Sequence, residues 1–388
     1  MKYAGNYLQA AIAVIQQYEG KLPFQHHLKA YFSAHKKHGS KDRKHISHAC
    51  YCYYRLGQAD KNLPIEEKIK LALFLCNNEP GIWAIVFDEK YLHAWSENGA
   101  ERIAFIQNQH SIDVNNIFSW QDELSESIDP KTFILSHLVQ PDLFIRVRPG
   151  KENVVSNKLK EQNIDFQKLS PTCIALPNNS KADSILELNK EAVIQDYSSQ
   201  RIQEFLLASN LSSPTVWDCC AASGGKSILA YDTLKQIKLS VSDIRTTILQ
   251  NLKQRFAEAG ITKYNSFVMD AAKNGSSFKQ KFDLIICDAP CSGSGTWGRT
   301  PEQLSFFTTD KIEYYANLQQ KIVSNTIQHV APGGYFLYIT CSVFQKENED
   351  ITNFIQQKFP ALQLIKKEVL IGYNKKADTM FAALFKVQ

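Results

Sequence analysis

The chain has 388 residues and a mild excess of basic side chains, 44 against 39 acidic ones, for a net charge of +5. Its length suffices for roughly two or three domains, its composition is ordinary for a soluble globular protein, and its charge permits a polyanionic partner without requiring one. No apolar run is long enough to span a membrane or to form the core of a signal peptide, so we expect a cytoplasmic protein with no membrane partner.

Nine cysteines are scattered through the sequence, which favours reduced thiols over a disulfide framework. Cys50 and Cys52 are separated by a single residue, and Cys219 and Cys220 are adjacent. Neither pair has the CxxC spacing of a zinc site. We therefore expect this protein to bind no metal ion.

Residues 1–127 are predicted to form a mainly helical region. Apolar side chains recur at helical spacing over residues 8–18, 46–54 and 65–75. Between the first two stretches, residues 35–45 read HKKHGSKDRKH, with four lysines, one arginine and one acid. This segment is either a solvated connector or a patch that contacts phosphates, because Lys and Arg neutralise a nucleic-acid backbone without reading its sequence. Residues 81–124 have a mixed pattern from which we predict no element.

Residues 128–190 are predicted to form a small α/β domain. Leu143–Val147 and Cys173–Leu176 have the pattern of short strands, and residues 154–162 have that of a helix. Arg146 and Arg148 lie at the end of the first strand, and arginines at the edge of a compact sheet could contact RNA. The alternative is a spacer domain with ordinary surface arginines, and the pattern does not decide between the two.

From residue 191 onward, strands and helices alternate regularly, which predicts a parallel sheet wrapped by helices. The predicted strands cover residues 215–219, 239–242, 266–269, 282–287, 335–339 and 380–387. The predicted helices cover residues 248–259, 312–330 and 347–357, and a turn of small residues at 221–227 opens another. The long helix is expected to stop at the sequence Pro332-Gly333-Gly334.

Small and acidic residues follow the first three of these strands. The turn Gly224-Gly225 allows a ligand to approach the backbone at a helix N-terminus. Asp243 lies 18 residues beyond Gly225, close to the spacing at which an acid binds ribose hydroxyls, and Asp270 at the next strand end could hold an adenine edge. Together these residues indicate a nucleoside site. An NTPase is not favoured, because Cys220 stands where the first glycine of a P-loop would be.

An acid and a thiol follow the fourth strand. Residues 282–295 read FDLIICDAPCSGSG, a short apolar run followed by Asp288, Pro290 and Cys291. Pro290 cannot donate to a sheet ladder, so the strand must end near it. The acid and the thiol therefore lie where a parallel strand leaves its sheet, which is where open α/β folds bind ligands. The alternative, for this stretch alone, is a buried cysteine beside a capping aspartate.

Three stretches, DCCAASGGKS at 218–227, DAPCSG at 288–293 and YITCS at 338–342, resemble successive motifs of the Sun/Fmu (RsmB-like) family of S-adenosylmethionine-dependent RNA cytosine-5 methyltransferases. Residues 195–200, 299–302, 318–319, 347–349 and 378–381 also resemble that family. The resemblance is strong over residues 190–388, weaker over 130–190, and weakest over 42–57, which are similar to part of a helical NusB-like domain. Ser223, Ser227 and Thr379-Met380 stand where the family usually has Pro, Thr and Gly-Phe.

The resemblance implies an α/β fold, with a Rossmann-like class I methyltransferase domain over residues 191–388 behind the small α/β domain and the helical region. It implies methyl transfer from S-adenosylmethionine to C5 of a cytosine in RNA, in rRNA rather than tRNA. In that family the TCS thiol, here Cys341, is the nucleophile, and the PC thiol, here Cys291, promotes release. Asp288 would hydrogen-bond the cytosine edge, and Lys226 would lie near the methyl donor. The residues implied to hold the cofactor are Cys220, Ala221, Ala222, Ser223, Gly224, Gly225, Lys226, Asp243, Asp270 and Asp288.

The chemistry of cytosine gives two thiols distinct tasks. C5 is a poor nucleophile, and a thiolate that adds to C6 turns C5 into an enamine carbon able to attack an electrophilic methyl group. The C5 proton must then be removed before the thiolate can leave. The alternatives are a tRNA methyltransferase, a small-molecule methyltransferase, and a non-catalytic RNA-binding relative, against which the presence of both Cys291 and Cys341 argues. We expect a monomer, although no sequence feature reports the oligomeric state.

Overall fold

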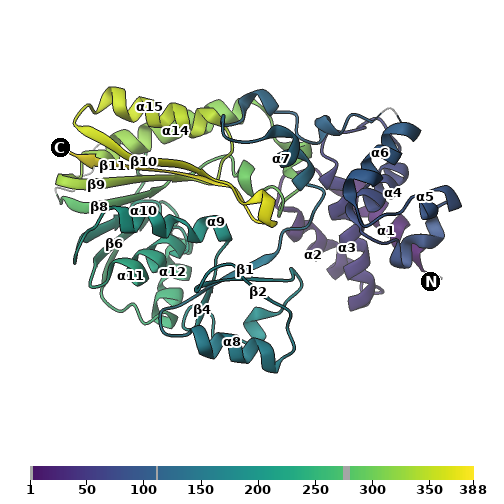
Figure 1. The fold of residues 1–388 in the computed structure, drawn as a ribbon, viewed down its shortest axis with the longest axis horizontal. Coiled ribbons are helices and arrows are strands. Elements are labelled where there is room, and N and C mark those ends of the chain that lie inside the picture. Colours follow the sequence, from purple (N-terminus) through teal and green to yellow (C-terminus); the bar gives the residue numbers. More distant parts are fainter. Residues whose placement is uncertain (1–2, 111, 274–279) are drawn as a thin grey trace. The chain divides into compact units, whose positions relative to one another are not determined.

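The computed structural model describes residues 3–110, 112–273 and 280–388, and Figure 1 shows its helices and strands. The chain divides into two compact units that are interleaved along the sequence. The first, called here the helical unit, comprises Met1–Asp122, Asp129–Gln140 and Trp297–Thr308. The second, the sheet unit, comprises Glu123–Ile128, Pro141–Thr296 and Thr309–Gln388. The division into three domains at residues 127 and 190 stays a prediction.

The helices of the helical unit are α1 (Ala4–Gln17), α2 (Phe24–Ala34), α3 (Ser40–Arg55), α4 (Ile65–Cys76), α5 (Glu89–His93), α6 (Gly99–Gln109), α7 (Pro130–Ser136) and α13 (Gln303–Phe306). Helices α1, α3 and α4 occupy the three stretches predicted from apolar spacing. Helix α2 is absent from that prediction, although its buried side chains, Phe24, Leu28, Tyr31 and Phe32, recur at helical spacing. Of the basic segment 35–45, residues 40–45 belong to α3, so only its first half connects two helices.

Residues 297–308 return the chain to the helical unit and lie in its core. The ring of Trp297, which is 1% exposed, contacts those of Phe118 and Trp120, with centroid separations of 5.8 and 5.4 Å. The Glu302 carboxylate accepts a hydrogen bond from the backbone N–H of Phe24, the first residue of α2 (3.2 Å). Aromatic packing and this hydrogen bond therefore join segments far apart in the sequence.

A small antiparallel sheet in the sheet unit has the strand order β2-β3-β1-β4. Its strands are β1 (Leu143–Val147), β2 (Gln167–Lys168), β3 (Cys173–Leu176) and β4 (Ala192–Ile194), and α8 (Glu152–Glu161) follows β1. The sequence left open whether Arg146 and Arg148 contact RNA at a sheet edge or are ordinary surface arginines. Neither alternative fits their surroundings, because β1 is an inner strand. Both guanidinium groups form ion pairs of 2.6 Å with the buried Asp232 carboxylate. These arginines have a structural role.

The large sheet has the strand order β10-β11-β9-β8-β5-β6-β7. Its strands are β5 (Thr215–Asp218), β6 (Lys238–Asp243), β7 (Tyr264–Val268), β8 (Phe282–Asp288), β9 (Val330–Thr340), β10 (Leu362–Leu370) and β11 (Met380–Val387). The five strands from β9 to β7 are parallel, and β10 and β11 are antiparallel to their neighbours. The Val, Ile and Leu side chains of β5, β8 and β9 are buried, as in a parallel sheet covered on both faces.

The other helices of the sheet unit are α9 (Tyr197–Gln200), α10 (Ile202–Ala208), α11 (Gly225–Leu234), α12 (Thr246–Glu258), α14 (Asp310–Ile327) and α15 (Glu349–Lys358). Figure 1 shows α14 and α15 on one face of the large sheet and α10, α11 and α12 on the other. The predicted Rossmann-like α/β fold is confirmed. Within the described residues, no helix combines the length and the apolar character needed to cross a membrane.

The chain between α14 and β9 differs from the prediction. Helix α14 ends at Ile327, and β9 begins at Val330, so Pro332, Gly333 and Gly334 lie within the strand instead of ahead of it. The irregular sequence coincides with a register shift in the pairing of β8 with β9. Strand β10 was missed because its exposed lysines and glutamate hide the alternation that an edge strand shows.

Candidate active site

A cavity of about 500 Å³ lies at the carboxyl ends of β5, β6, β8 and β9, within the usual size range of small-molecule sites. It brings together seven residues singled out from the sequence, namely Cys220, Ala222, Asp243, Asp270, Asp288, Cys291 and Cys341. The remaining ones, Ala221, Ser223, Gly224, Gly225 and Lys226, belong to the adjoining turn and the start of α11. The strand-end residues predicted from the sequence therefore line one cavity, and their roles stay a prediction.

The backbone of the turn between β5 and α11 is strained, with left-handed φ values. Ala222 and Gly224 have φ values of 46° and 83°. A Cβ atom at Gly224 would lie 2.6 Å from a ring carbon of Phe256, so glycine is needed there for both conformation and space. The guanidinium of Arg255 donates to the backbone oxygen and the hydroxyl of Ser223, at 3.0 and 2.8 Å. Ser223 is therefore fixed by this arginine.

Asp243 ends β6 with its side chain buried at the cavity wall. Its carboxylate accepts hydrogen bonds from the backbone N–H groups of Ala222 (3.0 Å) and Arg245 (2.9 Å) and from the Arg245 guanidinium. Burial alone would raise the pKa of Asp243, but the hydrogen bonds from Arg245 outweigh it and hold the pKa below its ordinary value. The carboxylate is thus ionised at neutral pH and held rigidly.

The wall of the cavity also contains residues to which the sequence analysis assigned no cofactor-binding or catalytic role. Ile244 and Met269 supply apolar side chains beside Asp243 and Asp270, while the others are Cys219, Arg245, Ala271, Ala272, Ala289, Pro290, Tyr315, Leu318 and Ile322. Asp270 accepts a hydrogen bond from the backbone N–H of Ala272 (3.0 Å). Carboxylates beside apolar walls fit a nucleoside, whose ribose is polar and whose base is flat and apolar on its faces. Ile244 and Met269 could have been identified from the sequence, because each is adjacent to an acid at a strand end.

Lys226 and Asp288 form an ion pair. The Lys226 ammonium, on the first turn of α11, lies 3.1 Å from Oδ2 of Asp288 at the end of β8. The lysine side chain is 10% exposed and the aspartate side chain 30% exposed. Lys226 therefore orients the Asp288 carboxylate, and Asp288 lines the cavity.

Cys291 and Cys341 meet although 50 residues separate them. Their Sγ atoms are 3.1 Å apart, and the backbone N–H of Cys341 points to Sγ of Cys291 (3.4 Å). The hydrogen bond with Cys341, together with burial, raises the pKa of Cys291 well above its usual range. Both thiols line the cavity, which distinguishes them from inert cysteines of an apolar core.

A buried carboxylate joins the loops that carry the two thiols. Glu347, fully buried, accepts hydrogen bonds from the backbone N–H of Ser292 (2.9 Å), the Gln319 amide (2.9 Å) and the Ser342 hydroxyl (2.7 Å). Ser292 follows Cys291 and Ser342 follows Cys341. Burial raises the pKa of Glu347, an effect that these hydrogen bonds partly offset. The sequence showed Glu347 only within a family motif, and its function in the structure was not predicted.

Residues 205–384 match a family model described as 16S rRNA methyltransferase RsmB/F. The chain is 30% identical over 231 residues to the probable ribosomal RNA small subunit methyltransferase B of Bacillus subtilis (strain 168), covering 58% of this chain and 51% of that protein. It is 34% identical over 173 residues to the tRNA (cytosine(72)-C(5))-methyltransferase NSUN6 of Mus musculus, covering 40% of this chain and 35% of that protein. The chain thus spans about half, or less, of the length of these relatives.

Two solved structures have a similar fold. The crystal structure of PH0851 has a TM-score of 0.73 at 20% sequence identity and covers 98% of both chains. The crystal structure of NSun6 from Pyrococcus horikoshii with SFG has a TM-score of 0.59 at 14% identity and covers 69% of this chain and 96% of that one. At such identities the likeness concerns the fold alone, which agrees with the α/β architecture described above.

Proposed function

We propose that this chain is an S-adenosylmethionine-dependent methyltransferase of the RsmB/F kind, whose family model matches residues 205–384, and that it methylates C5 of a cytosine in RNA, in rRNA rather than tRNA. The observation that carries this proposal is the 3.1 Å approach of two thiols in a cavity that also holds three strand-end carboxylates. The B. subtilis relative, named for ribosomal RNA, favours rRNA. A tRNA cytosine is the second candidate, because mouse NSUN6 is named for one.

S-adenosylmethionine would supply an electrophilic methyl group. We assign its ribose to Asp243, its adenine to the surroundings of Asp270, and its methionine end to the turn at residues 220–226. The cavity supports this assignment, since a buried ionised carboxylate is suited to accept hydrogen bonds from ribose hydroxyls. The Arg245 side chain now donates to both oxygens of Asp243. A ribose must therefore displace this guanidinium, which is 60% exposed and has room to move.

The two thiols would act in sequence on the cytosine. The Cys341 thiolate adds to C6, and the electron pair displaced from the C5–C6 double bond makes C5 nucleophilic. C5 would then take the methyl group as its bond to the cofactor sulfur breaks and S-adenosylhomocysteine leaves. A base would next remove the C5 proton, and the C–S bond to the cysteine would break to regenerate the thiolate. Asp288, held by Lys226, is placed to accept hydrogen bonds from the cytosine edge. In this scheme, Cys291 assists the elimination.

The raised pKa of Cys291 supports this division of roles. At a separation of 3.1 Å, the two sulfur atoms share a hydrogen bond. The pKa of Cys291 is raised by that contact and by burial, so Cys291 is the thiol that retains its proton. A protonated thiol is a poor nucleophile, which favours Cys341 over Cys291 for the attack on C6.

The decisive experiment separates the two thiols. Cys341→Ala should abolish methyl transfer and form no covalent complex, whereas Cys291→Ala should add and methylate but stall before release. The stalled protein should appear as a band that survives denaturing electrophoresis and disappears with nuclease, and the double variant should lose that band. An adduct in Cys341→Ala but not in Cys291→Ala would assign the nucleophile to Cys291. Intact methylation without an adduct in either variant would exclude covalent catalysis by both thiols.

The target RNA requires a separate experiment. Bisulfite sequencing of total RNA from a deletion strain and its parent should show one or more cytosines that lose protection in the deletion. Loss confined to rRNA would support the first candidate, and loss confined to tRNA would support the second. Unchanged protection of every cytosine would contradict RNA cytosine-5 methylation as the activity.

A further inference from the structure

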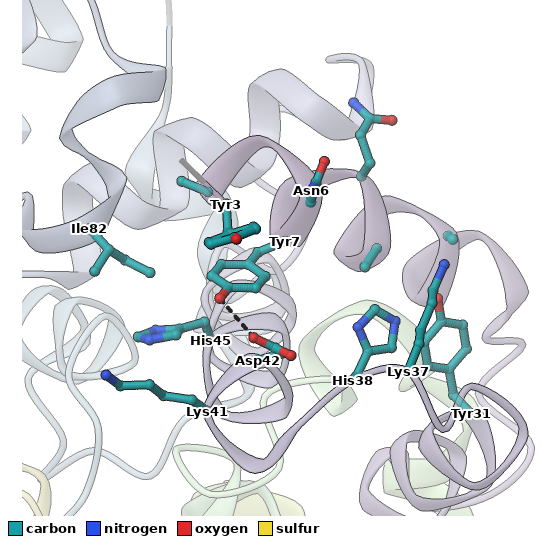
Figure 2. A pocket seen from close by; sticks show the side chains of 14 residues that line it. Tyr3, Asn6, Tyr7, Tyr31, Lys37, His38, Lys41, Asp42, His45 and Ile82 are labelled. Carbon is teal, nitrogen blue, oxygen red and sulfur yellow. Dashed lines mark hydrogen bonds between the residues drawn. The ribbon is translucent and has the colours of Figure 1, made fainter. Parts of the chain in front are cut away.

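The helical unit contains a hollow of about 970 Å³ between the first half of α1 and the junction of α2 with α3. Figure 2 shows Tyr7, Asp42, His45 and Lys41 together, with His38, Lys37 and Tyr31 beside them. Its walls thus combine aromatic rings with cationic side chains. This combination is typical of surfaces that bind single-stranded nucleic acid.

The aromatic side of the hollow is already ordered. The rings of Tyr7 and His45 are stacked, with centroids 5.4 Å apart and planes 22° from parallel. The buried Trp83 ring packs edge-on against both of them, at 6.4 and 6.5 Å. Burial lowers the pKa of His45, so this imidazole is neutral at pH 7 and has flat faces suited to stacking. Tyr3, whose side chain is 63% exposed, stands at the rim and is free to cover a base.

The polar side of the hollow favours an anion. Among the described lining residues Asp42 is the one acid, and its oxygens accept hydrogen bonds from the Tyr7 hydroxyl and the Gly39 backbone N–H, both at 2.8 Å. Lys37 and Lys41 line the same hollow and are exposed. Nε2 of His38 is buried and has no hydrogen-bond partner among the described residues. A buried polar atom without a partner indicates a missing ligand or water.

We propose that this hollow binds a single-stranded segment of the RNA substrate, with a base against Tyr3 and the Tyr7–His45 pair and phosphates on Lys37 and Lys41. The inference rests on the proposed function for the substrate class. Stacking needs an unpaired base, which is why a single strand fits and an A-form duplex does not. The volume exceeds that needed for one nucleotide, so the hollow admits a short stretch of chain.

A binding assay that involves no methyl transfer tests this site. The probe is a fluorescent oligouridine of about 12 nucleotides, which has no cytosine to react with Cys341, titrated with the full chain over a range of salt concentrations. Lys37→Ala with Lys41→Ala should lower the slope of log K against log salt by about 1.4, since each phosphate contact on a single strand contributes about 0.7. The matched control replaces Lys238 and Lys253, two exposed lysines of the sheet unit, and should leave the slope unchanged.

Tyr3 tests the stacking half of the proposal. Tyr3→Ala should weaken oligouridine binding by about 5- to 150-fold, the affinity equivalent of one base–aromatic stack, while Tyr3→Phe should bind as the wild type does. Because Tyr3 is exposed, neither change should alter the fold. Circular dichroism of both variants checks this expectation.

Three results would overturn the proposal. The first is an unchanged salt slope in the Lys37/Lys41 variant. The second is equal affinity of the wild-type protein for oligouridine and for a duplex of the same length. The third is a Lys37/Lys41 variant that loses binding to phosphatidylserine vesicles but still binds oligouridine. The last result would mark a membrane-facing surface. Conversely, a wild-type protein that binds oligouridine with the expected salt slope but methylates no RNA would refute the proposed function and leave this site standing.

Discussion

Glu347→Gln is expected to slow methyl transfer without changing S-adenosylmethionine binding. Oε2 of Glu347 accepts from Ser292 and Gln319, and Oε1 accepts from the hydroxyl of Ser342. A glutamine can keep one accepting oxygen, but its NH₂ group then faces Ser342. The Ser342 hydroxyl oxygen already accepts hydrogen bonds from the Phe344 backbone and the Ser292 hydroxyl. The substitution therefore removes one charge-assisted hydrogen bond, worth about 1.5–3 kcal/mol.

The lost hydrogen bond is one of those by which Glu347 joins the loop that carries Cys291 to the loop that carries Cys341. If this loss is expressed wholly in the placement of the thiols, the rate of methyl transfer falls by about 10- to 150-fold. Single-turnover methylation with saturating cofactor and RNA measures this rate, and calorimetry measures cofactor affinity. In a Cys291→Ala background, the covalent adduct should also form more slowly when Glu347 is replaced, because the position of Cys341 is disturbed.

Glu191→Gln is the matched control for Glu347. Glu191 is 5% exposed and accepts hydrogen bonds from the Lys158 ammonium and the Glu187 backbone, but it lies by the small sheet. Its replacement should destabilise the protein to a similar degree and leave the rate per folded molecule unchanged. Equal rates in the two variants, or parallel loss of cofactor affinity in Glu347→Gln, would refute a positioning role for Glu347.

The remaining predictions concern the cofactor turn and strand ends. Asp243→Ala should weaken S-adenosylmethionine binding in calorimetry, whereas Arg245→Ala should not, since the ribose must displace that guanidinium; weaker binding in Arg245→Ala would contradict this. Burial raises the pKa of Asp218 to about 7, so the native state holds an extra proton between about pH 4 and 7 and unfolding free energy falls as pH rises, by up to about 1.4 kcal/mol per unit. In urea titrations Asp218→Asn should lose this slope; a slope that persists would assign it to other groups. Gly224→Ala should lower stability by about 1–3 kcal/mol in the same titrations, because its Cβ would meet Phe256 in a left-handed conformation; an unchanged midpoint would show that the turn relaxes.

The strand ends could be predicted from the sequence because a buried parallel strand has a recognisable local sequence pattern. An apolar run that stops on an acid, as at Asp243 and Asp288, gives both the element and its functional edge. The contacts of Arg146 could not be predicted in this way, since whether a strand is inner or outer depends on segments that pair with it from elsewhere in the chain. For the same reason, the hydrogen bonds of Glu347 to two loops, one of them more than 50 residues upstream, have no local signature.

The roles of the predicted site residues remain proposals, but their grouping in one cavity follows from the topology. Cys291 and Cys341 lie just after the ends of the adjacent strands β8 and β9, so their proximity could be inferred once those strands were known to pair. The ion pair of Lys226 with Asp288 could not be inferred, because a lysine side chain reaches many partners from one backbone position. Sequence reasoning therefore placed Lys226 near the methyl donor and missed the ion pair that occupies its ammonium.

The segment Trp297–Thr308 has a consequence for modularity. It immediately follows the loop that carries Cys291, yet Trp297, Leu304 and Phe307 are buried among residues of the helical unit. A fragment trimmed to residues 191–388 would leave these side chains without a core to enter, and a contiguous apolar surface of this kind promotes aggregation. We therefore expect gene fusion, deletion or recombination at residue 190 to disrupt folding, because the two units are interleaved along the sequence and do not separate at one position. An insertion in the helical unit would have to leave intact the packing of Trp297 against Phe118 and Trp120.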